Sequence, residues 1–90
     1  MDVSVVIATY NRGNLLTSLL QQYEKILRVT KYEFEIIFSD DGSIDNSVEL
    51  LENYRGPVNI KVLKNNHLGA AGARNSAIEY CEGKIAIFTG

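Results

Sequence analysis

Two short polar segments carry the residue types best suited to chemistry in this sequence. Asp40 and Asp41 follow one apolar run, and the Thr-Tyr-Asn-Arg segment at residues 9–12 follows another. A carboxylate can accept hydrogen bonds from a ribose hydroxyl or a base N–H, and a tyrosine ring offers a stacking face with a polar tip. Together they predict nucleoside binding. The Asp-Asp-Gly-Ser segment is equally typical of a turn that starts a helix, so local pattern alone leaves both interpretations open.

The acidic pair has a second possible chemistry. Carboxylates suit Mg²⁺ and Mn²⁺, but two carboxylates alone under-determine a metal site. If the pair held Mg²⁺ in a receiver-like signalling domain, a further phosphorylatable aspartate would have to end another strand, and no aspartate follows Asp45.

A Gly-Ala-Ala-Gly segment at residues 69–72 opens a predicted helix, with Arg74 in its first turns. Free amides at a helix N-terminus beside a guanidinium form a plausible diphosphate site. Close packing of the helix on a sheet explains the small residues equally well. Neither G-x-G-x-x-G nor a Gly-Lys-Ser/Thr motif occurs. His67 is interpreted as a solvated loop residue, and Cys81, the only cysteine, as a packing residue.

Hydrophobic periodicity predicts the elements that position these residues. Four apolar runs predict strands at residues 3–8, 34–39, 59–64 and 84–89, the third at or near a sheet edge. Apolar spacing predicts a first helix with a stripe from Leu15 to Leu27. The stripe of a second helix comprises Ile44, Val48, Leu51 and Tyr54, with Ser43 or Asp45 as its cap. A third helix spans about residues 70–82, and its packing side comprises Ala70, Ala73, Ala77 and Cys81.

This alternation predicts an α/β, Rossmann-like fold with a parallel sheet in the order 3-2-1-4 and a single domain over residues 1–90. In such sheets a ligand lies beyond the carboxyl ends of the strands, where the winding direction reverses. Residues 8–12, residues 40–43 and whatever follows Thr89 are expected at that crevice.

Composition narrows the class of protein. The chain has 90 residues and a formal net charge of −2. It therefore lacks the positive excess that is typical of nucleic-acid-binding domains. No apolar run is long enough to span a bilayer, and the N-terminus lacks a signal-peptide pattern. These observations predict a cytoplasmic protein.

Four blocks, in this order, resemble the family 2 glycosyltransferases of the GT-A fold. They are residues 3–12 (VSVVIATYNR), 35–45 (EIIFSDDGSID), 69–75 (GAAGARN) and 82–88 (EGKIAIF). The resemblance implies that Ala8, Thr9 and Tyr10 line a nucleobase pocket with Arg12 at its rim. It implies that Asp40 and Asp41 hold base and ribose, Asp41 being the preferred base contact, and that Gly69 and Arg74 lie near the diphosphate. Ala8 replaces the family's commoner proline, and Ile44 its frequent threonine.

The resemblance also implies what this sequence lacks. In the family, the strand matching residues 84–88 leads into an Asp-rich motif that binds Mn²⁺ or Mg²⁺ on the diphosphate of the sugar donor, whereas this sequence ends at Gly90. The catalytic base and acceptor-binding half are likewise expected downstream. We therefore expect the nucleotide-binding part of a partial GT-A fold, which binds a nucleoside diphosphate sugar, with UDP favoured, and is inactive alone. The alternative is a non-catalytic nucleotide-binding module. Exposed sheet surface is expected to favour a homodimer.

Overall fold

Four parallel strands form one sheet in the computed structural model, which describes residues 1–89. They are β1 (Val3–Thr9), β2 (Phe34–Asp40), β3 (Asn59–Lys64) and β4 (Ile85–Thr89), in the order β3-β2-β1-β4. The predicted strands and the predicted order 3-2-1-4 are confirmed. Every residue of β2 is buried, as expected for an inner strand of a parallel sheet whose faces are both covered.

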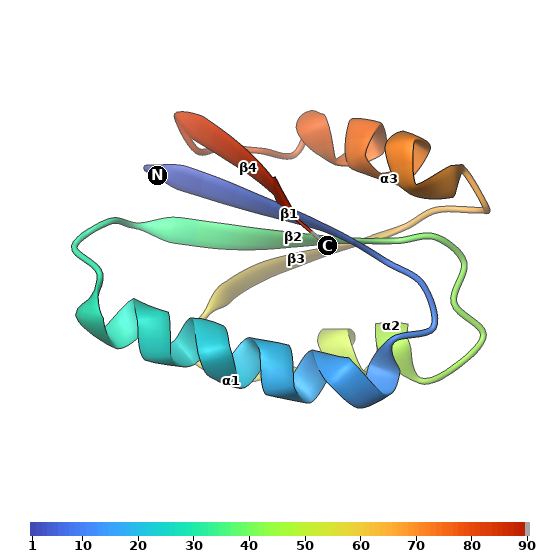
Figure 1. Cartoon of the computed structure of the whole chain (residues 1–90), viewed down its shortest axis with the longest axis horizontal. Coiled ribbons are helices and arrows are strands. Elements are labelled where there is room, and N and C mark those ends of the chain that lie inside the picture. Colours follow the sequence, from blue (N-terminus) through green and yellow to red (C-terminus); the bar gives the residue numbers. More distant parts are fainter. Residues whose placement is uncertain (90) are drawn as a thin grey trace.

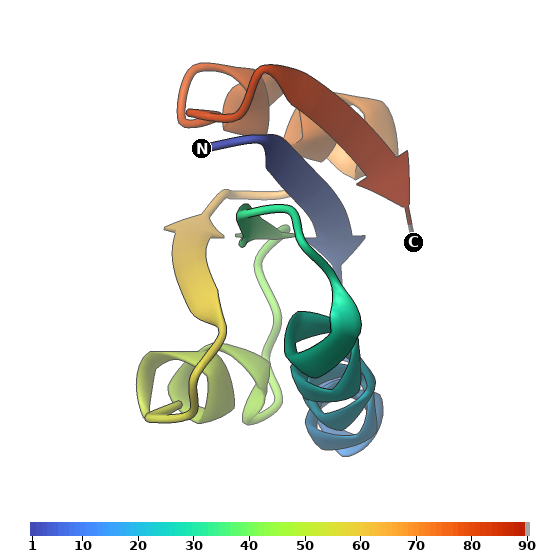
Figure 2. The same cartoon turned by 90° about the vertical axis from the view of Figure 1, so that its left-hand side faces the viewer.

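Helices cover both faces of the sheet (Figures 1 and 2). Helices α1 (Gly13–Val29) and α2 (Ser47–Glu52) lie on one face, and α3 (Gly69–Ile78) lies on the other. The larger core lies beneath α1 and α2, with Ile36, Phe38 and Leu51 at its centre. The smaller core joins Val6 and Ile37 to Ala77. Ala77 and Ala73 are fully buried, so α3 approaches the sheet through small side chains, as predicted.

The structure corrects the predicted bounds and packing of the second and third helices. Helix α2 begins at Ser47 and has six residues, so Ile44 precedes it and is 88% exposed rather than part of its buried stripe. Tyr54 lies beyond the end of α2 but still packs on the larger core. Helix α3 ends at Ile78 rather than near Glu82, because the following residues turn back toward the sheet. Ala70 is exposed instead of packed.

That turn is bound to a buried carboxylate on β2. Glu35 is fully buried, and its Oε2 accepts hydrogen bonds from Ser4 Oγ at 2.6 Å and from the Glu82 N–H at 2.8 Å. Lys61 Nζ, on β3, lies 3.0 Å from Glu35 Oε1, so Lys61 is the partner of a buried charge. Burial opposes ionisation of Glu35, but these hydrogen bonds and the Lys61 ammonium together lower its pKa.

Strand β4 is exposed along its whole length. Ile85 and Ile87 pair with Val3 and Val5, and paired residues of parallel strands point to the same face of the sheet. Since Val5 belongs to the core beneath α1, Ile85 and Ile87 lie on the α1 side. They are 61% and 48% exposed.

Candidate nucleotide-binding site

The carboxyl ends of β1 and β2 bring the two polar segments together. Thr9 pairs with Asp40 in the parallel ladder, so the loops that follow both strands leave the sheet at one edge. The Asp41 N–H donates to the Thr9 carbonyl at 2.9 Å. The loop after β3 joins them there, because the Asn65 N–H donates to the Asp40 carbonyl at 2.7 Å. Three loops that are distant in sequence therefore meet at this end of the sheet. Residues 8–12 and 40–43 were predicted there, and the loop after β3 was not. The third predicted segment, which follows Thr89, lies outside the described residues.

The first two loops are hydrogen-bonded to each other. The Asn11 N–H donates to Ser43 Oγ at 2.8 Å, and Asn11 Oδ1 accepts from the Ile44 N–H at 2.9 Å. Asn11 has a φ of +51°, a conformation that asparagine adopts more readily than most residues. These hydrogen bonds fix Asn11, and with it the backbone of its neighbours Tyr10 and Arg12, relative to the acidic turn at residues 40–43.

Asp45 joins the starts of two helices. Its Oδ2 accepts from the Gly13 N–H at the start of α1, and its Oδ1 accepts from the Ser47 N–H at the start of α2. The Ser47 hydroxyl is the strongest influence on the pKa of Asp45, and with these amides it lowers that pKa despite an opposing desolvation effect. Of the two predicted helix caps, Asp45 takes a first-turn amide of α2, whereas Ser43 does not.

The adjacent carboxylates of Asp40 and Asp41 point to different partners. Asp40 is 1% exposed, and its oxygens accept from the Ser43 N–H at 2.8 Å and from Ser43 Oγ at 2.5 Å. Asp41 accepts from the Leu68 N–H at 2.6 Å and the Gly69 N–H at 2.9 Å, one to each oxygen. An ionised carboxylate has about four acceptor positions, so Asp41 retains positions for a ligand.

A cleft of about 210 Å³ lies between the end of β1 and helix α3. Its lining residues are Ala8, Thr9, Tyr10, Arg12, Asp41, Ala70, Ala73 and Arg74. Six of the eight residues predicted for nucleotide binding line it. The other two, Asp40 and Gly69, lie outside the lining: Asp40 is buried under the turn, and the Gly69 N–H is directed to Asp41.

The structure adds Ala70 and Ala73 to this wall. The sequence had assigned both to the packing side of α3. Their small size was a signal for close approach, but the sequence did not show that the space beside them opens into a cleft. The Leu68 and Gly69 amides at the start of α3 bind Asp41, so the first donors of the predicted diphosphate site are already partnered within the chain.

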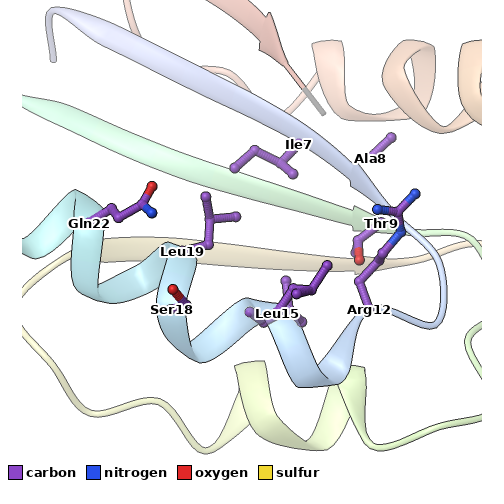
Figure 3. A pocket seen from close by; sticks show the side chains of 9 residues that line it. Ile7, Ala8, Thr9, Arg12, Leu15, Ser18, Leu19 and Gln22 are labelled. Atoms are coloured by element: carbon purple, nitrogen blue, oxygen red, sulfur yellow. The ribbon is translucent and has the colours of Figure 1, made fainter.

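A second, larger cleft of about 300 Å³ lies on the α1 side of β1 (Figure 3). It shares Ala8, Thr9 and Arg12 with the first cleft, but its remaining wall is mainly apolar, with Leu15, Leu16 and Leu19 among its residues. The only charged side chain in its wall is Arg12. The smaller cleft is therefore the better candidate for a charged, hydrogen-bonding ligand, because it combines a ring, a carboxylate and two guanidinium groups.

The acidic pair does not fit a metal centre. Both oxygens of Asp40 bind Ser43, while Asp41 is turned toward the loop before α3. Within residues 1–89 no three His, Cys, Asp or Glu side chains are grouped closely enough to hold a metal ion.

A four-stranded parallel sheet in this order, with helices on both faces, defines an α/β protein of the Rossmann-like class. The model of the Glycosyl transferase family 2 matches residues 4–89. The chain belongs to this family.

Individual relatives agree with this assignment. The chain is 37% identical over 90 residues to the poly(ribitol-phosphate) beta-N-acetylglucosaminyltransferase TarS of Staphylococcus aureus, and this match covers 98% of the chain and 16% of TarS. It is 38% identical over 89 residues to an undecaprenyl-phosphate 4-deoxy-4-formamido-L-arabinose transferase of Pseudomonas fluorescens, covering 94% of the chain and 26% of that protein. The chain thus spans about a sixth to a quarter of these relatives.

Solved structures confirm the fold. A crystal structure of S. aureus TarS in complex with UDP superposes with a TM-score of 0.83 at 33% identity, covering 99% of this chain and 27% of that one. TarS has also been crystallised with UDP-GlcNAc, and this structure gives the same TM-score of 0.83. The GT-A assignment of the sheet and helices is therefore confirmed.

Proposed function

We propose that this chain is the nucleotide-binding part of a glycosyltransferase that takes a nucleoside diphosphate sugar, with UDP-sugar favoured, and transfers the sugar to an acceptor hydroxyl. One observation carries the proposal: Tyr10, Asp41, Arg12 and Arg74 line a single cleft at the reversal point of the sheet. The TarS complexes with UDP and UDP-GlcNAc support the choice of nucleotide.

Each part of the cleft has a role in this proposal. The Tyr10 ring packs against the nucleobase, and the remaining acceptor positions of Asp41 bind the base N–H or a ribose hydroxyl. Arg12 and Arg74 attract the diphosphate, for which guanidinium groups have suitable charge and geometry.

Sugar transfer needs two functions that the proposal places outside these residues. The acceptor hydroxyl needs a general base, and the leaving diphosphate needs its charge neutralised, a role that the resemblance assigns to Mn²⁺ or Mg²⁺. We therefore expect the 90-residue chain alone to bind nucleotide and not to transfer sugar. A metal-dependent transfer rate from the purified chain would contradict this.

No helix within residues 1–89 combines the length and apolar character needed to cross a membrane, and the cytoplasmic location stays a prediction.

Calorimetric titration of the chain with UDP, GDP and UMP tests the proposal. UDP should bind more tightly than UMP because of its second phosphate, and more tightly than GDP if the pocket selects uracil. Arg74→Gln should weaken UDP binding about five- to fiftyfold, as expected for loss of a charge-assisted hydrogen bond. Arg28→Gln is the matched control, because Arg28 is exposed in the last turn of α1, away from the cleft residues.

Tyr10→Ala should also weaken UDP binding, and Tyr32→Ala is its matched control, since Tyr10 and Tyr32 are 47% and 56% exposed. Failure of the folded wild-type chain to bind UDP would overturn the proposal. Equal effects of the cleft variants and their controls would show that binding occurs elsewhere.

A further inference from the structure

His67 lies in the loop between β3 and α3, and its ring covers the turn that carries Asp41. A Cβ atom added to Gly42 would lie 3.1 Å from His67 Cε1 and 3.2 Å from Nε2. Gly42 also has a φ of +86°, which disfavours any larger residue there. His67 is an exposed loop residue, as the sequence predicted, but its ring also packs on the turn at residues 40–43.

The same ring also pairs with the ring of Tyr10. The Tyr10 and His67 ring centroids are 6.0 Å apart, and the ring planes cross at 71° in an edge-to-face arrangement. This distance and angle lie within the range favoured by aromatic pairs. Tyr10 is 47% exposed, so a neighbouring ring limits the orientations that its side chain can adopt.

The loop holds His67 in place through hydrogen bonds on both sides of it. Before His67, Asn65 donates to Ser39 Oγ at 2.7 Å through its side chain. After it, the Leu68 and Gly69 amides donate to Asp41 at 2.6 and 2.9 Å. The φ of His67 is +54°, a left-handed conformation in which histidine, like asparagine and aspartate, occurs more often than most residues.

We propose that His67 is a positioning residue for the nucleobase, which orients the Tyr10 ring so that its face is presented to the cleft. This rests on the proposed function, since Tyr10 is its proposed base contact. The loop between β3 and α3 thereby positions both recognition groups: its amides hold Asp41, and its histidine ring holds Tyr10. Deleting the ring should weaken recognition of the base and leave recognition of phosphate unchanged.

His67→Asn tests the proposal, because asparagine tolerates the left-handed backbone but has no ring. We expect its Kd for UDP to rise about three- to tenfold, the range of one aromatic pair. Its Kd for inorganic diphosphate, which has no base, should stay at the wild-type value. Asn66→Ala, at the exposed neighbour in the same loop, is the matched control and should change neither.

A second readout separates positioning from general stability. In a Tyr10→Ala background, His67→Asn should have no further effect on UDP affinity, since the ring that it orients is gone. Circular dichroism of each variant verifies that it is folded.

Unchanged UDP affinity in His67→Asn, with wild-type binding intact, would overturn this inference alone. Equal loss of UDP and diphosphate affinity, or a full further loss in the Tyr10→Ala background, would also overturn it, because the histidine would then only support the loop. Absence of UDP binding by the folded wild-type chain would overturn the inference together with the proposed function.

Discussion

At the residue scale, Asp40 and Asp41 show how neighbouring identical side chains take different roles. Asp40 is the last residue of β2 and is buried, whereas Asp41 has left the strand. Side chains of successive residues at a strand end point in different directions, so one carboxylate holds the Ser43 turn and the other reaches the loop before α3. The sequence identified the pair but could not assign the two roles, because their partners are fixed only by the tertiary structure.

This division predicts different effects on stability. Asp40→Ala removes a buried acceptor and leaves the Ser43 N–H and hydroxyl without it, so the free energy of unfolding should fall by about 1–3 kcal/mol. Asp41→Asn keeps one carbonyl oxygen for a loop amide and should destabilise the chain less. Urea denaturation of both variants measures the difference. A smaller loss for Asp40→Ala than for Asp41→Asn would contradict the assignment.

At the element scale, the buried Glu35 connects β2 to the turn that leads into β4. Glu35→Gln should lower the free energy of unfolding by about 1–3 kcal/mol at neutral pH, because Lys61 loses its buried partner. The lowered pKa of Glu35 gives the sign of the pH dependence. The stabilisation is complete above the unfolded pKa of about 4.5 and is lost as the pH falls through the lower folded pKa.

Urea denaturation at neutral pH and below pH 4 tests this dependence. The difference between wild type and Glu35→Gln should shrink in acid. Glu79→Gln, at an exposed carboxylate after α3, is the matched control and should stay within about 0.5 kcal/mol of wild type. A difference that is constant with pH would show that ionised Glu35 is not the stabilising species.

The same turn has a second constraint at Gly83. A Cβ atom there would lie 2.5 Å from the Ser4 backbone nitrogen, and the Gly83 N–H donates to Ser4 Oγ at 2.8 Å. Gly83→Ala should therefore push the turn away from β1 and lower the free energy of unfolding by about 1–3 kcal/mol. A melting curve measures this effect, and an unchanged midpoint would show that the turn can shift without loss.

At the scale of the whole molecule, the sequence predicted the architecture better than the contacts. Alternating apolar runs and helical stripes depend on local periodicity, so the elements and the strand order were predictable. The end of α3 was not, because the turn after it is bound by Glu35 on β2, 47 positions away from Glu82. The site residues followed from the resemblance, whereas His67 could be interpreted only once its ring was seen beside Gly42 and Tyr10.

Strand β4 is exposed, and for this reason we still predict that the 90-residue chain forms a homodimer. Burial of Ile85 and Ile87, which are 61% and 48% exposed, would favour association of two copies. Sedimentation velocity should show mass increasing with concentration. Ile87→Lys should reduce it, since a charged residue opposes edge pairing. Ile44→Lys, at a side chain that is 88% exposed in the loop before α2, is the matched control. A monomer at every concentration would contradict the prediction.

The position of β1 between β2 and β4 has a consequence for the order of folding. Of the four described strands β1 is made first, yet one of its edges is paired by β4, and Gly83 bonds to Ser4 across 79 positions of sequence. Contacts of such separation form late, because the intervening chain must first be ordered. Strands β1, β2 and β3 should therefore gain protection against hydrogen exchange before β4 does, and the edge of β1 that pairs with β4 stays open until residues 85–89 are made.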